Sequence, residues 1–134
     1  MRFNICAIAV SLILAGAVGC GTELSEREQI EAERRQLRAE FGSLFDEVSG
    51  ILFELDPIGI NFKTNTDEYE PEVGTILPRL QTCHSATEVR KVVHEEFVKW
   101  FSPADVGPEA KYQEAGDEIW AAWERHRAGK QADG

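Results

Sequence analysis

The strongest constraint on the fold is an apolar repeat with helical spacing in the first half of the chain. Large apolar side chains recur at intervals of four and three residues, at Leu37, Phe41, Leu44, Val48, Ile51 and Leu55. This spacing places them on one face of an α-helix for about five turns, and such a face must be covered. We favour a domain core over a coiled-coil dimer as the cover, because three more apolar segments follow. The alternation of Val, Ile and Thr that a sheet needs is missing, so we predict an all-α fold.

Prolines and capping residues mark where the helices after this repeat begin and end. The pair Asp56-Pro57 ends the first helix, because the residue before proline avoids helical backbone angles. A capping box at Ser85 starts a later helix. We predict helices over residues 71–82, 86–101 and 109–127. Together with the first helix they form a small four-helix bundle.

The first helix begins ahead of the apolar repeat, in a charged stretch. Ser25 and Glu28 match a capping box, and the residues from Glu26 to Glu40 are mostly Glu, Arg, Gln and Ala. We therefore predict that the first helix is extended as a charged, solvated stalk of about 20 Å. Gly42 or Gly50 either marks a bend or allows close packing.

The N-terminus has the features of a leader for export. The apolar run from Ile5 to Val18 has the length of a signal-peptide core and is too short to span a bilayer as a helix. The segment that follows, Ala17-Val18-Gly19-Cys20, resembles the lipobox of bacterial lipoproteins. This resemblance implies that the leader is removed and that Cys20 carries acyl chains. With Gly21 next, it also implies the outer membrane in a Gram-negative cell. The alternative is a conventional secretory leader with Cys20 unmodified.

These features divide the chain into four predicted parts. The signal peptide covers residues 1–19, and the lipidated cysteine, spacer and stalk cover 20–40. The helical domain covers 41–128. A small, polar, frayed tail covers 129–134.

The charge of the chain restricts its partners. Fourteen basic and 24 acidic side chains give a formal net charge of −10. Such a surface repels nucleic-acid phosphates and anionic lipid headgroups, so we expect no nucleic-acid partner and membrane contact only through the lipid. A basic protein is the partner that this charge attracts. The alternative is that the charge only keeps the domain soluble.

The middle of the chain carries two short motifs with a family resemblance. The residues concerned are Asp56-Pro57-Ile58-Gly59, Asp67-Glu68-Tyr69, Pro71-Glu72, Ile76, Leu80, Phe97 and Trp100. On these, the stretch from Leu44 to Phe101 resembles the YugE-like (DUF1871) family of small, uncharacterised bacterial proteins. The resemblance implies a compact helical fold, implies no established activity, and favours a protein-binding role.

The same motifs have a structural and a functional interpretation. In the structural one, which we favour, Asp56 turns the chain, Gly59 takes a positive φ, Asp67 caps the next helix and Tyr69 lays its ring on the core. The functional interpretation makes an acidic recognition patch of Asp56, Asp67, Glu68, Tyr69 and Glu72.

No pattern in the chain predicts catalysis, a metal or a cofactor. His84, His94 and His126 have no spacing that pairs them as zinc ligands, and the loop before Glu72 lacks the EF-hand order. The nucleophile and phosphate-loop motifs are missing, and exposed carboxylate pairs are usually a solvated face. Cys83 has no predicted partner, so we expect a buried, inert thiol.

The three tryptophans are also expected in the core. Trp100, Trp120 and Trp123 lie at helical spacing with other apolar residues, which favours packing over a stacking surface for a ligand. The leading functional prediction is therefore a membrane-tethered, non-catalytic lipoprotein that binds another protein. The alternatives are a structural, envelope-maintenance lipoprotein and, less favoured, a small hydrolase.

Overall fold

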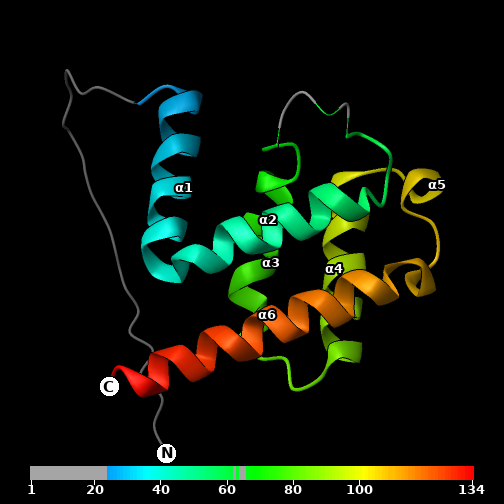
Figure 1. The fold of residues 1–134 in the computed structure, drawn as a ribbon. Helices are drawn as coiled ribbons and strands as arrows, with labels where there is room; N and C mark the ends of the chain where they lie inside the picture. Colours follow the sequence, from blue (N-terminus) through cyan, green and yellow to red (C-terminus); the bar gives the residue numbers. More distant parts are fainter. Residues whose placement is uncertain (1–23, 62, 64–65) are drawn as a thin grey trace, which may run out of the picture. The chain divides into compact units, whose positions relative to one another are not determined.

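The computed structural model describes residues 24–61, 63 and 66–134, so the leader and the lipobox cysteine lie outside the described residues. Within the described part the chain forms helices and turns without a strand, which confirms the all-α prediction (Figure 1). The elements are α1 Glu26–Phe41, α2 Ser43–Leu55, α3 Glu70–Leu80, α4 Ala86–Trp100, α5 Pro103–Val106, the 3₁₀ helix η1 Glu109–Tyr112, and α6 Gln113–Ala132.

The predicted first helix is two helices, because the chain breaks at Gly42. Its backbone has φ 57° and ψ −135°, a conformation that residues with a Cβ rarely adopt. Gly50, the other predicted site of a bend, stays inside α2 with open space around it. The backbone conformation therefore requires glycine at Gly42 and does not require it at Gly50.

Contacts divide the chain into two units, residues 1–32 and 33–134. The larger unit thus begins inside α1, earlier than the predicted domain start at residue 41. Leu37 reaches the backbone of Gly74 on α3, where an added Cβ would lie 3.1 Å from its Cδ1, and Phe41 is buried. Arg34 and Arg38 also form ion pairs with Glu70, 32 residues away from Arg38 along the chain. Such distant pairings are not visible in the composition of the charged stretch.

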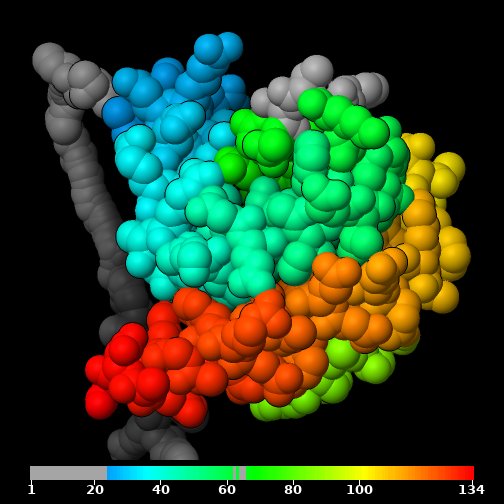
Figure 2. Space-filling view, viewed as in Figure 1, coloured from blue at the N-terminus to red at the C-terminus, as the bar shows by residue number. Residues whose placement is uncertain are grey.

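Four helices of the larger unit pack in a ring. Helix α2 contacts α3 and α6, and α4 contacts the same two helices. In Figure 1, α3 and α4 run in opposite directions, and so do α2 and α6. Figure 2 shows α2 and α6 as adjacent bands on one face of this unit. The apolar sides of all four helices meet inside the ring.

Aromatic side chains fill the centre of this core. Phe97 of α4 lies with its ring centroid 5.8 Å from that of Tyr69, 5.4 Å from that of Tyr112 and 5.7 Å from that of Phe101. Both tyrosines and Phe97 are fully buried. The Tyr112 hydroxyl donates a hydrogen bond to the Val106 carbonyl at 2.9 Å, and burial raises the pKa of Tyr112 to about 12. The cluster joins α4 to the segments that precede α3 and α6.

The first predicted capping box is complete, and the second is present in one of its two hydrogen bonds. The hydroxyl of Ser25 accepts from the Glu28 N–H at 3.4 Å, and the Glu28 carboxylate accepts from the Ser25 N–H at 2.8 Å. The hydroxyl of Ser85 accepts from the Glu88 N–H at 3.2 Å, but the Glu88 carboxylate accepts from the N–H of His84 and not from that of Ser85. The starts of α1 and α4 therefore follow from local sequence.

The end of the chain differs from the prediction. The predicted fourth helix, residues 109–127, is η1 followed by α6, and α6 continues to Ala132. The segment before it, predicted as a loop, contains the short helix α5, which Ser102 caps by accepting from the Asp105 N–H at 3.3 Å.

Helices α4 and α6 approach each other closely at Gly116. A Cβ at this position would lie 2.7 Å from Cβ of Arg90 and 2.9 Å from its Cα. These are backbone and near-backbone atoms, so they can yield only if the helices move apart.

We expect Gly116→Ala to lower the free energy of unfolding by about 1–3 kcal/mol, since overpacking forces the backbone to shift. Gly129→Ala in the same helix is the matched control, because its surroundings are open. The control should be neutral or more stable by up to about 1 kcal/mol, the helix propensity gained over glycine. Urea unfolding followed by circular dichroism measures both. Equal effects of the two substitutions would contradict the close contact.

Candidate functional site

The first predicted motif forms a turn organised by one carboxylate oxygen. Helix α2 ends at Asp56, whose backbone is left-handed with φ 43°. Oδ1 of Asp56 accepts from the backbone N–H groups of Ile60 at 2.8 Å and Asn61 at 3.0 Å, and from the Tyr69 hydroxyl at 2.6 Å. Gly59 has the predicted positive φ, 74°. The motif therefore closes the connection after α2 and ties it to the core.

Tyr69 occupies the place that the structural interpretation predicts. Its ring is fully buried against Phe97, and its hydroxyl donates to Asp56. Burial and then this hydrogen bond raise the pKa of Tyr69 well above its usual range. The residue acts as a neutral hydrogen-bond donor inside the fold.

The five residues of the predicted recognition patch do not share one exposed surface. Tyr69 and Glu72 are buried, and Asp67 and Glu68 are half-buried. Glu72 lies in the first turn of α3, and the register of this helix turns its side chain inward.

The prediction that Asp67 caps α3 is wrong. The N-cap of α3 is Tyr69, and no described side chain accepts a capping hydrogen bond there. Oδ1 of Asp67 is buried without a partner among the described residues. The Asp67 carbonyl, not its side chain, accepts from the Glu70 N–H at 3.2 Å.

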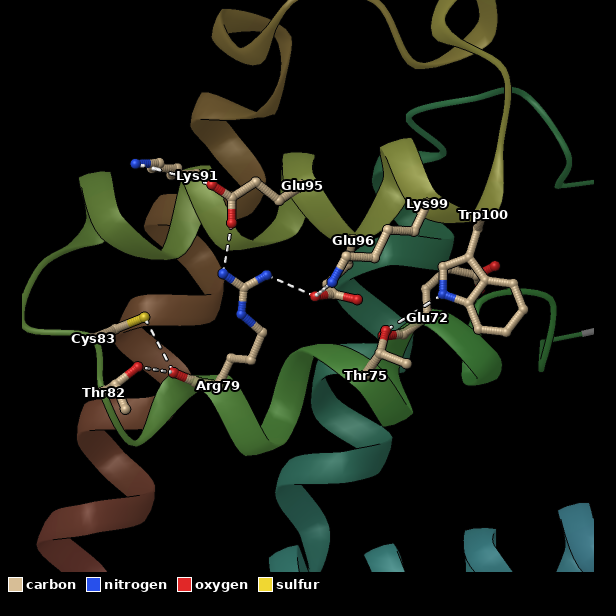
Figure 3. A network of polar contacts seen from close by, with 10 residues as sticks. All are labelled: Glu72, Thr75, Arg79, Thr82, Cys83, Lys91, Glu95, Glu96, Lys99 and Trp100. Atoms are coloured by element: carbon tan, nitrogen blue, oxygen red, sulfur yellow. Dashed lines mark hydrogen bonds and ion pairs between the residues drawn. The ribbon is translucent and has the colours of Figure 1, made fainter.

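A network of ion pairs joins α3 to α4, and sequence reasoning missed it (Figure 3). Arg79 of α3 donates from Nη1 to Oε1 of Glu96 and from Nη2 to Oε2 of Glu95, both at 2.6 Å. Nζ of Lys99 lies 2.9 Å from Oε1 of Glu96, and Nζ of Lys91 lies 3.9 Å from Oε1 of Glu95. The guanidinium fork thus holds two neighbouring carboxylates of the facing helix.

The carboxylates of this network stay ionised. Burial alone would raise the pKa of Glu96, whose side chain is 4% exposed, but hydrogen bonds from Lys99 and Arg79 lower it. The pKa of Glu95 is lowered mainly by the hydrogen bond from Arg79. Each acid of the network therefore has a cation, and the network is electrically satisfied.

At the C-terminal end of α4, Thr75 of α3 contacts both Glu72 and Trp100. The Thr75 hydroxyl donates to the Glu72 carbonyl at 2.9 Å and accepts a long hydrogen bond from Nε1 of Trp100 at 3.4 Å. Figure 3 shows Glu72, Thr75 and Trp100 together at this end. We call these three residues the Trp100 site.

The carboxyl group of Glu72 is unusual on this surface. The residue is 3% exposed, and Oε2 has no hydrogen-bond partner among the described residues. Burial raises the pKa of Glu72. A buried carboxyl oxygen without a donor is costly, so such a group is a candidate for binding one.

The structure separates the three tryptophans, which the sequence placed together in the core. Trp123 is buried and Trp120 half-buried, but Trp100 is 48% exposed. The expectation is wrong for Trp100 because α4 ends there, at the edge of the core. Helical spacing gives the face of a side chain but not its distance from that edge.

The remaining chemistry-bearing residues have structural roles. Cys83 is buried, as predicted, and free; its thiol lies 3.5 Å from the Arg79 carbonyl, and burial raises its pKa. Nε2 of His94 lies 2.9 Å from the Gly107 carbonyl oxygen. His126 stacks on Trp123, and burial lowers its pKa.

No three His, Cys, Asp or Glu side chains among the described residues come close enough to hold a metal ion. No helix in this part of the chain has the length and apolar character needed to cross a membrane. Neither a protein-family model, a curated protein nor a solved structure matches the chain.

We expect Glu72→Gln to stabilise the fold in a pH-dependent way. Because the pKa of Glu72 is higher in the folded than in the unfolded state, its contribution to stability falls as pH rises from 4.5 through the folded pKa. The substitution removes this loss, so the melting temperature should exceed that of the unmodified chain near pH 7 and match it below the unfolded pKa.

Thermal unfolding near neutral pH and near pH 4 checks this expectation. Glu68→Gln removes a charge from a half-buried neighbour and is the control for net charge. An equal gain at both pH values for Glu72→Gln would contradict the assignment.

Proposed function

We propose that this chain is a membrane-tethered lipoprotein whose helical unit binds another protein and catalyses no reaction. The lipobox-like segment that ends at Cys20 supports the tether. A net charge of −10 disfavours electrostatic docking on anionic lipids, so acyl chains on the sulfur must hold the protein. Each buried CH₂ group contributes about 0.8 kcal/mol, and several chains together hold firmly. The expected location is the cell envelope, at the outer membrane in a Gram-negative host.

In this proposal the charged stretch within residues 20–40 serves as a stalk, and α2, α3, α4 and α6 form the four-helix bundle that it carries. Ahead of residue 33 the stretch is rich in Glu and Arg and has few apolar residues, so that part needs no cover, whereas Leu37 and Arg38 contact α3. The bundle has its own apolar core.

One observation carries the binding role: the exposed indole of Trp100. Tryptophan is a costly residue to leave at the surface and is enriched among the residues that dominate protein interfaces. At 48% exposure, it is the most exposed large apolar side chain of the larger unit. If the surface charge served only to keep the domain soluble, no exposed tryptophan would be needed.

We expect Cys20→Ser to release the protein from the membrane, since the substituted residue cannot carry the thioether-linked lipid. Fractionation of cells should find the unmodified chain with the membranes and the variant in the soluble fraction. Intact mass should show the added acyl groups only on the former. Cys83→Ser is the control and should remain with the membranes. An unmodified thiol at Cys20, on protein from the soluble fraction, would refute the tether.

A photoreactive phenylalanine at position 100 tests the binding role in native membranes. We expect one discrete cross-linked protein from this position and none from the same group at Glu118, an exposed residue of α6. The yield should fall with added salt, because an acidic surface attracts its partner through screened charges. Adducts from neither position would contradict the binding role and favour a structural one.

A further inference from the structure

We propose that the Trp100 site recognises one basic side chain of the partner, the guanidinium of an arginine or the ammonium of a lysine. The indole of Trp100 would take the cation on its face, and the carboxyl of Glu72 would pair with it. The inference rests on the proposed function and names the chemistry of the partner at that surface.

The first argument is the distribution of charge between α3 and α4. Glu95 and Glu96 are each held by cations of the chain, within 2.6 Å of Arg79. Nζ of Lys99, the nearest lysine in sequence to Trp100, is committed to Glu96 at 2.9 Å. Glu72 forms no ion pair within the described part of the chain, and its Oε2 has no donor there. A cation of the partner would therefore give the Glu72 carboxyl the ion pair that it lacks.

The second argument is the open face of the indole. Trp120 and Trp123 both have the Arg127 guanidinium over their rings, 5.4 and 5.8 Å from the centroids. Arg38 lies over Phe45 in the same way, at 4.5 Å. Among the described residues no such cation covers Trp100. Aromatic faces attract guanidinium and ammonium groups, most strongly for tryptophan, so this face is free for a cation of the partner.

The third argument is that Thr75 connects the two groups. Its hydroxyl accepts from Nε1 of Trp100 and donates to the main-chain carbonyl of Glu72, and Figure 3 draws the Glu72 side chain beside them. The bond to the indole is long, 3.4 Å, and so holds the ring weakly. In the proposed complex the weakly held indole moves aside, and the docked cation then reaches the buried carboxyl of Glu72.

The combined site suits a basic side chain better than an apolar one. A hydrophobic group would cover the ring but leave the Glu72 oxygen without a donor. A cation satisfies both the ring and the oxygen, and the net charge of −10 attracts it from a distance.

The test titrates the full chain, isolated in detergent, with hexa-arginine and hexa-lysine. Hexa-acetyl-lysine, which keeps the length but lacks the charge, is the peptide control. The readout is the indole ¹⁵N–¹H signal of Trp100, identified by its loss in Trp100→Phe. We expect this signal to shift with both basic peptides and to remain fixed with the acetylated one.

Two substitutions decide whether the site or the overall charge is responsible. Glu72→Gln should weaken binding of hexa-arginine at least about fivefold, and Glu68→Gln, which removes the same charge nearby, should weaken it less than twofold. Trp100→Leu, which lacks the indole signal and is therefore followed by isothermal titration calorimetry, should weaken it as much as Glu72→Gln does. Thermal unfolding verifies that each variant is folded.

Equal weakening by Glu72→Gln and Glu68→Gln would overturn the site, because general acidity would then explain binding. A Trp100 signal that no basic peptide shifts would also overturn it. If the cross-link from position 100 forms nevertheless, the protein-binding role stands and only the basic side chain is refuted.

Discussion

Burial of Phe97 between two tyrosines is the interaction on which the larger unit depends. The two tyrosines belong to the segments that lead into α3 and α6. Each tyrosine carries a hydroxyl to the edge of the core, where Tyr69 holds the turn at Asp56 and Tyr112 holds the carbonyl of Val106. One apolar contact thereby fixes two connections, and the ring of four helices can close around it.

The surface over this core divides its charges unevenly. Arg79 and its neighbours neutralise Glu95 and Glu96, so the contact between α3 and α4 is both pinned and satisfied. About two turns away along α3, Glu72 is buried without a cation beside an exposed tryptophan. The carboxylates between these two helices are therefore paired with cations, whereas the carboxyl group of Glu72 at their end is not. A partner that supplies the missing hydrogen-bond donor and covers the exposed aromatic ring can gain binding energy there.

Local signals in the sequence predicted what depends on neighbours along the chain. The capping serines, the turn at Asp56, the positive φ of Gly59 and the burial of Cys83 all follow from residue type and spacing. The helical class followed from the period of the apolar residues.

What the sequence could not predict depends on residues far apart in it. The ion pairs of Arg38 with Glu70 and of Arg79 with Glu96 join partners whose proximity only the packed helices create. The inward turn of Glu72 and the exposure of Trp100 likewise depend on where each helix meets the edge of the core. Charged residues in a sequence normally predict a solvent-exposed face, so the sequence near a buried acid does not reveal that it is buried.

The sequestered thiol of Cys83 gives the molecule an internal reporter. With the leader removed and the other sulfur occupied by lipid, as proposed, the mature sequence keeps a single cysteine side chain able to react. Because that thiol is covered and its pKa is raised, alkylating reagents meet it only while the helices around it have opened. The rate at which it is modified is then a measure of how often the bundle breathes, taken on the unaltered chain and in its own membrane.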